Sequence, residues 1–263
     1  MIRLLPVAAL ALLAALPAQA QDQGESAPRR YRLALGPQFT PNYPGSDGVV
    51  ISPLIDLSMT RGDKPFDYEA ADESFGVPIV KTGGFEFGPA ANIQGNRRRR
   101  EAHAAIDEVG TTIELGGYSD LWLGSQFRLH GEVLQGVNGH NGLIGNAGLD
   151  YVARDGDKWL FAIGPRIALS DAKYRRAYFE VTPAVAARTG LPVYRADGGA
   201  VHAIGANATA SYQFTQHWGV YGYAKYDRLT GDAADSPITR ELGSRNQFSG
   251  GLALSYTFGK GVH

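Results

Sequence analysis

The stretch that decides the fold class is Arg245–Phe258, RNQFSGGLALSYTF. Its residues alternate between two unlike sets, as in a β-strand, whose successive side chains point to opposite faces. The apolar set consists of Phe248, Gly250, Leu252, Leu254, Tyr256 and Phe258, and the other set is small and uncharged. Aromatic rings about ten residues apart are typical of a tilted membrane strand with a ring at each interface. We therefore expect the apolar face to point outward into lipid and the other face to line a lumen.

The composition of the chain excludes several other classes of protein. Its 263 residues include no cysteine, which excludes disulfide frameworks, thiol catalysis, thiolate metal sites and a lipoprotein anchor. The formal net charge of −1 gives no reason to expect nucleic acid as a partner. No internal apolar run reaches the roughly eighteen residues that a membrane-spanning helix needs. A chain that crosses a membrane with this composition must therefore do so with strands.

The first twenty residues have the pattern of a secretory signal peptide. Arg3 supplies a positive charge, Leu4 to Leu16 an apolar core, and Ala18-Gln19-Ala20 a cleavage site between small residues. We expect residues 1–20 to be removed on export and residues 21–30 to be a flexible lead-in. Residues 31–258 are then the barrel in the bacterial outer membrane, and residues 259–263 are a short tail.

The alternation of the last strand recurs in at least ten segments of the chain. The predicted connections alternate between long loops at 96–108, 136–142, 171–199 and 230–244 and short turns at 81–84, 119–120, 155–158 and 215–217. Outer-membrane barrels show this asymmetry, with short periplasmic turns and long extracellular loops. Thr182, Pro183 and Gly190 predict one short helix within the loop at 171–199.

The number of strands depends on the segment Phe66–Val80, whose pattern is the least regular. With both termini in the periplasm the number is even. One strand in this segment gives eleven in all, whereas two short strands near 66–70 and 75–80 give twelve. The sequence therefore predicts an all-β, antiparallel, up-and-down transmembrane barrel of about twelve strands, with ten as the alternative if the segment is irregular.

Two loops contain distinctive blocks of residues. Tyr43-Pro44-Gly45-Ser46-Asp47 lies in the first loop, and Gly231-Asp232-Ala233-Ala234-Asp235-Ser236-Pro237 lies in the last. Both blocks resemble the MipA/OmpV family of outer-membrane proteins, and so does the run from Val181 to Tyr194. The resemblance implies a scaffold, because the best-known member links a lytic murein transglycosylase to a penicillin-binding protein in cell-wall assembly. Other members resemble surface adhesins or stress-responsive proteins. The resemblance implies no catalytic residue and no cofactor.

Two polar groups in the predicted loops are candidates for binding. Arg97, Arg98, Arg99 and Arg100 are a candidate contact for lipopolysaccharide, because guanidinium groups pair with phosphate; the alternative is a solvated loop. Asp232, Asp235 and Ser236 offer oxygen atoms to Ca²⁺, but they do not make a full ligand set. The alternative is that Asp-Ser-Pro fixes the loop through side-chain bonds to the backbone, so no metal site is expected.

The predicted lumen contains charges of both signs. Such a lining is typical of a cross-linked, filled barrel, whereas a selective pore tends to one sign. A narrow small-solute conduit remains the alternative, because twelve strands lie between filled barrels and open channels. His103, His140 and His202 are candidate rim histidines of a hydrolase, but none has a nucleophile motif beside it, and we expect no enzyme. The candidate luminal network is Arg128, His130, Glu132, Asp150, Arg154, Arg166, Lys225 and Asp227, with Arg32, Asp56, Glu86 and Glu114 on the same face.

Overall fold

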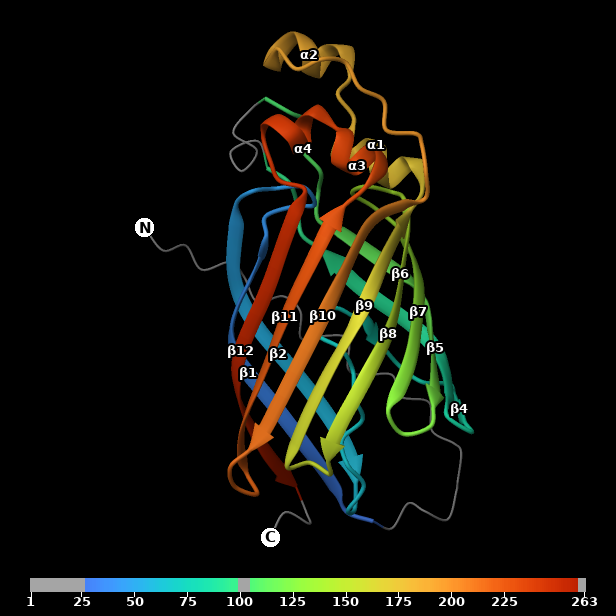
Figure 1. Ribbon diagram of the computed structural model, residues 1–263, viewed down its shortest axis with the longest axis vertical. Coiled ribbons are helices and arrows are strands. Elements are labelled where there is room, and N and C mark those ends of the chain that lie inside the picture. The colour runs from blue at the N-terminus through green and yellow to red at the C-terminus, as the bar shows by residue number, and fades with distance from the viewer. Residues whose placement is uncertain (1–26, 99–104, 260–263) are drawn as a thin grey trace.

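The computed structural model describes residues 27–98 and 105–259, which form twelve strands and four short helices. Neighbouring strands from β5 to β12 pair antiparallel, β12 pairs with β1, and β1 pairs with β2, so the sheet curls into a tall barrel (Figure 1). The strands are β1 Arg29–Pro41, β2 Val49–Arg61, β3 Phe75–Gly76, β4 Val80–Thr82, β5 Phe85–Gln94, β6 Thr112–Leu123, β7 Phe127–Gly136, β8 Leu143–Asp155, β9 Trp159–Ser170, β10 Val201–Gln213, β11 Trp218–Leu229 and β12 Asn246–Gly259.

The four helices cover one end of the barrel, and tight turns close the connections at the other (Figure 1). The helices are α1 Ala172–Phe179, α2 Pro183–Thr189, α3 Gly231–Asp235 and α4 Pro237–Glu241. Because long loops of such barrels face the exterior, the helical end is extracellular and the turn end periplasmic. None of the helices in the described ranges has the length and hydropathy that crossing a membrane requires.

The predicted polarity of the wall is confirmed. On β12, Leu252 and Leu254 are 63% and 51% exposed, whereas Ala253 between them is 2% exposed. On the inner side, Glu114 and Asp150 are completely buried. A soluble barrel would place the leucines inside and the carboxylates outside, because ionised groups are costly to bury and the burial of apolar groups is favourable. The outer surface is therefore suited to hydrocarbon.

The helix predicted within the loop at 171–199 is confirmed as α2. Thr182 Oγ1 accepts a hydrogen bond from the Val185 N–H at 3.2 Å and so caps the first turn. Pro183 occupies the first helical position, and Gly190 ends the helix with a φ of 78°. The helix α1, in the same loop, and the helices α3 and α4, in the last loop, were not predicted from the sequence.

The segment between β2 and β3 runs inside the barrel. We call residues 63–74 the inner segment. It begins at the periplasmic end, where the Phe66 N–H donates to Asp157 Oδ1 at 2.9 Å. It ends deeper in the lumen, where the Ser74 N–H donates to Glu132 Oε2 at 3.2 Å. The strand expected near 66–70 is therefore wrong, although its alternation is real: Phe66, Tyr68 and Ala70 are buried against the inner wall.

The predicted total of twelve strands is confirmed, but the inner segment changes how that number arises. β3 and β4 both pair with β5, and Val77 and Ile79 between them also donate to β5 carbonyl groups. They form one interrupted line beside β5. The inner segment carries the chain from the periplasmic end back through the lumen to Phe75, where β3 begins. β5 and the later strands therefore keep alternating between the two directions.

Candidate functional site

The lumen contains a network of ion pairs around Arg128. Its guanidinium group donates to both carboxylate oxygens of Glu73, at 2.6 and 2.8 Å. It also donates to Asp120 Oδ2 at 2.8 Å, and His130 Nδ1 lies 2.8 Å from Asp120 Oδ1. The Arg128 side chain is 2% exposed, so two carboxylates compensate an otherwise buried charge.

A second group of ion pairs surrounds Asp72, the residue before Glu73. Arg166 Nε donates to Asp72 Oδ2 at 3.0 Å, and Lys225 Nζ lies 3.4 Å from the same oxygen. Lys225 also pairs with Asp227 at 3.0 Å, and Arg166 pairs with Asp150 at 2.9 Å. Adjacent residues of the inner segment thus bind different strands of the wall, and Asp150 on β8 lies between the two groups, 3.8 Å from Arg128 and 2.9 Å from Arg166.

The structure brings together most of the predicted luminal network. Arg128, His130, Glu132, Asp150, Arg166, Lys225 and Asp227 belong to the two connected groups around Glu73 and Asp72. Arg154 lies apart at the periplasmic end, where it donates to the Phe66 carbonyl oxygen at 2.8 Å. Asp72 and Glu73 were not predicted to belong to this network. The available signal was two adjacent acidic residues in an irregular segment, together with basic residues in the predicted lumen that need acidic partners.

A chamber of about 490 Å³ lies between the inner segment and the extracellular helices. Its floor includes Asp72, Glu73 and Ser74, and its upper part includes Tyr174 and His202. Lys225 and Asp227 lie on its wall. The lumen is therefore divided, with ion pairs below and a polar space above.

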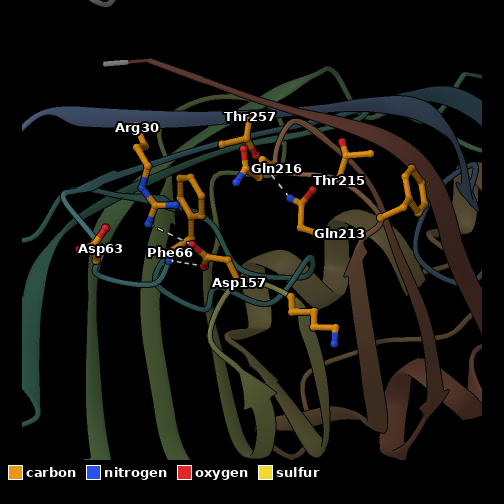
Figure 2. Close-up of a pocket in the computed structure, with 10 residues that line it drawn as sticks. Arg30, Asp63, Phe66, Asp157, Gln213, Thr215, Gln216 and Thr257 are labelled. Atoms are coloured by element: carbon orange, nitrogen blue, oxygen red, sulfur yellow. Dashed lines mark hydrogen bonds and ion pairs between the residues drawn. The ribbon is translucent and has the colours of Figure 1, made fainter. Parts of the chain in front are cut away.

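A second hollow, of about 520 Å³, opens at the periplasmic end (Figure 2). Arg30 and Asp157 form an ion pair at 3.0 Å, and the Arg30 guanidinium carbon lies 5.2 Å from the centre of the Phe66 ring. Figure 2 shows these three side chains grouped on one side of the hollow, with Gln213, Thr215 and Thr257 opposite. We call this the periplasmic hollow. The ends of five segments meet there, including β1, β12 and the β8–β9 and β10–β11 turns.

The first loop contacts the last loop and the start of β12 at the extracellular end: the Ser244 N–H donates to the Gly45 carbonyl oxygen at 2.9 Å. Gln247 Nε2 donates to the Ser46 carbonyl oxygen at 3.0 Å, and the Gly45 N–H donates to Gln247 Oε1 at 3.1 Å. Tyr43 is buried in the same core as the helices. Pro44 is partly exposed and Asp47 is exposed, so the block is mainly an internal contact.

The second motif fixes the turn between α3 and α4. Ser236 Oγ donates to the Phe179 carbonyl oxygen at 2.6 Å and accepts from the Ile238 N–H at 3.2 Å. Asp235 pairs with Arg245 at 2.9 Å, and Asp232 accepts from the Gly198 N–H. Gly231 begins α3 and Pro237 begins α4. These carboxylates bind protein donors, and no group of three or more metal-ligating side chains occurs in the described ranges.

The prediction that Arg97 contacts lipopolysaccharide is wrong. Arg97 is 3% exposed, and its guanidinium donates to the carbonyl oxygens of Tyr178 and Asp107 at 2.6 and 2.9 Å. Burial lowers its pKa, but an arginine remains charged after such a shift. Arg97 therefore anchors α1 to the loop after β5. Arg98 is partly exposed, and Arg99 and Arg100 lie outside the described residues.

The candidate histidines do not form a rim site. His140 Nε2 lies 2.7 Å from Glu114 Oε1, and both side chains are completely buried. His202 is buried beside Tyr174, with ring centres 5.3 Å apart. His103 lies outside the described residues. His140 also packs against Tyr174, with ring centres 4.9 Å apart, so both described candidates belong to the internal packing around this ring.

Comparisons with known proteins agree with the sequence resemblance. The family model of MltA-interacting protein MipA matches residues 33–258. A search of the curated proteins gives no match. Among solved structures, the chain is similar to an outer-membrane channel from Pseudomonas putida F1, to which it is 11% identical. The match covers 91% of this chain and 100% of that chain, and its TM-score is 0.43. The chain is also similar to a loop-deletion mutant of OmpT, an outer membrane protein of Vibrio cholerae, with 10% identity, 88% and 98% covered, and a TM-score of 0.35.

Proposed function

This chain, an outer-membrane β-barrel, belongs to the family of MltA-interacting protein MipA, and on that premise we propose that it is a scaffold for enzymes of cell-wall assembly. The partners are a lytic murein transglycosylase, the class to which the family name refers, and a penicillin-binding protein. Residues 1–20, outside the described ranges, act as the export signal in this proposal. The lipid and lipopolysaccharide of the outer membrane surround the barrel.

The observation that carries the proposal is the periplasmic hollow. Its walls come from segments far apart in the sequence, and Phe66 and Asp157 fix the start of the inner segment to the β8–β9 turn. A recessed surface on a rigid support is suited to receive a projecting side chain of a partner. Lys158, Gln216 and Thr215 are exposed at its border and are available for contact.

A charge reversal at the hollow tests the proposal. Lys158→Glu changes the sign of an exposed side chain without removing any hydrogen bond that we describe. Lys173→Glu makes the same change on α1, at the opposite end of the barrel, and is the matched control. Tagged protein is extracted in mild detergent, and the murein enzymes that copurify are quantified. The scaffold proposal predicts a loss with Lys158→Glu alone. It is rejected if neither the unaltered protein nor the control recovers a murein enzyme under conditions that retain a known pair.

A narrow conduit for small solutes is the second candidate, and the chamber favours it. The chamber above the inner segment has a volume of about 490 Å³, which is enough for a small solute. Passage to the periplasm requires that the inner segment move, because its ion pairs fill the lumen below. Planar-bilayer conductance separates this candidate from the scaffold, which needs no open path.

A further inference from the structure

The wall of the barrel is incomplete on one side. The hydrogen-bonded path of strands ends at β2 in one direction and at β3 and β4 in the other. β3 begins at Phe75, which pairs with Ala91, so Asn92 to Gln94 of β5 have no strand partner on that side within the described ranges. β2 pairs only with β1 in those ranges. Lipid cannot satisfy the polar backbone groups of a free strand edge, so these edges need another partner.

The chamber above the inner segment extends to this gap. Its lining includes Val50 of β2, which shares the inward face of that strand with Leu54, and Ile93 of β5, an outward residue that is 64% exposed. The same cavity is lined by Lys225 and Asp227, which face the lumen. A cavity lined from both faces of a wall passes through that wall. We call this opening, between Val50 and Ile93 with Ser74 below it, the lateral opening.

The two sides of the lateral opening differ in chemistry. Its outer border carries some of the most exposed apolar side chains of the barrel, with Ile51 at 76% and Phe75 at 73%. In the chamber behind it, the carboxylates of Asp72, Glu73 and Asp227 are paired with Arg166, Arg128 and Lys225. Glu132 is the lining carboxylate that has no arginine or lysine partner in the described part of the chain. The contrast suits a molecule with an apolar tail and a positive head.

Two chamber residues have capacity for a donor head group. Glu132 accepts from the neutral Ser74 N–H and Asn146 Nδ2 groups at 3.2 and 2.8 Å, and its nearest cationic candidate, His130 Nε2, is 3.8 Å away. His202 is 9% exposed and lines the chamber, and its Nδ1 has no hydrogen-bond partner in the described part of the chain. An ammonium group offers only donors, which matches a carboxylate and a ring nitrogen acceptor.

We propose that the lateral opening admits single-chain amphiphiles with an amine head from the outer leaflet. The head enters the chamber toward Glu132 and His202, and the tail stays in the lateral opening between Val50 and Ile93. No covalent step is involved. The inference goes beyond the scaffold role, which concerns the opposite end of the barrel.

Photolabelling of the full-length protein in lipid nanodiscs tests this inference. The probe is dodecylamine with a diazirine in its tail, and the control probe is the dodecanoate of the same design. Labelled residues are mapped by mass spectrometry. We expect the amine probe to label Val50, Ile51 and Ile93 above the background on outward residues such as Leu149, with excess unlabelled dodecylamine removing that difference.

Two variants refine the result. Ile93→Trp narrows the lateral opening from the lipid side and is expected to abolish the excess label on β2, whereas Leu149→Trp, an outward residue of β8, leaves it unchanged. Heat-modifiable gel migration confirms that each variant is folded. Uniform labelling around the barrel, or equal labelling by the carboxylate probe, would overturn the proposal. Both measurements are made on the unaltered protein, so they do not depend on whether the variants fold.

Discussion

The guanidinium group of Arg128 on β7 and the carboxylate of Glu73 on the inner segment form a two-bond ion pair, at 2.6 and 2.8 Å. The two residues are 55 positions apart, and their side chains are 2% and 7% exposed. This pair ties the inner segment to the wall. Because a bidentate pair constrains direction as well as distance, it fixes where the inner segment lies in the lumen.

Removal of Glu73 is expected to destabilise the barrel strongly. Glu73→Ala leaves Arg128 buried with one hydrogen-bonded carboxylate, Asp120, instead of two, and breaking a buried pair costs roughly 3–5 kcal/mol. The free energy of unfolding in urea, followed by tryptophan fluorescence in lipid vesicles, measures the loss. The control is Asp67→Ala, which breaks a pair with Lys81 whose side chains are 72% and 56% exposed and which costs about 0–1 kcal/mol. Equal losses in the two variants would contradict the assigned role of Glu73.

Neutral substitutions in the inner segment are expected to raise ion conductance. The double variant Asp72→Asn and Glu73→Gln keeps the side-chain shapes but weakens the bonds to Arg166 and Arg128, so the segment is held less firmly in the lumen. Planar-bilayer recording should give a low conductance for the unaltered protein and a higher one for the variant. Asp67→Asn, on the same segment but exposed, should behave as the unaltered protein. A large, constant conductance in all three would mean that the inner segment does not close the lumen.

Two glycine substitutions separate backbone strain from crowding at the extracellular end. Gly45 and Gly190 have φ angles of +95° and +78°, so an alanine at either position costs about 1–2 kcal/mol. A Cβ at Gly45 would also lie 3.1 Å from the Phe179 ring, whereas none of the described atoms lies within 4 Å of a Cβ at Gly190. Gly45→Ala is therefore expected to destabilise the extracellular helices more than Gly190→Ala. Protease cleavage within residues 171–199 reports the difference, and equal cleavage rates would contradict it.

Loss of the Ser236 hydroxyl is expected to loosen α4. Ser236→Ala removes the cap on the Ile238 N–H and the bond to the Phe179 carbonyl oxygen, and the loss of a cap costs about 0.5–2 kcal/mol. Hydrogen exchange at the Ile238 amide should become faster. Ser125→Ala, an exposed change in the β6–β7 turn, is the control. Unchanged exchange at Ile238 would show that the hydroxyl does not hold this turn.

The sequence predicted the wall of the barrel well, because alternation is a local property. The last strand was expected at 245–258 and is Asn246–Gly259, and α2 was predicted from its cap, proline and glycine. The turn expected at 119–120 is wrong, since β6 continues to Leu123. Ser119-Asp120 looked like a turn because both residues are polar, but in an inverted barrel Asp120 is an inward residue that pairs with Arg128.

The inner segment could not be predicted from alternation alone. Phe66, Tyr68 and Ala70 alternate because one side of an extended chain packs on the inner wall, and this pattern is the same as that of a strand. What distinguishes the two is the set of partners of Asp72 and Glu73, and these lie between 55 and 153 positions away in the sequence, outside any local window. The helices α3 and α4 were missed for a related reason: they are five residues long and are held by contacts with α1 rather than by their own pattern.

The apolar side chains of the wall face lipid, and the charged ones meet inside the barrel. Because the chain has no cysteine, single cysteines at Leu252, Ala253, Leu254 and Ser255 of β12 each give a unique labelling site. Spin labels at these four positions in lipid vesicles are compared for their collision rates with oxygen, which concentrates in hydrocarbon. We expect high rates at 252 and 254 and low rates at 253 and 255, and the opposite alternation would mean that the apolar side chains face the lumen.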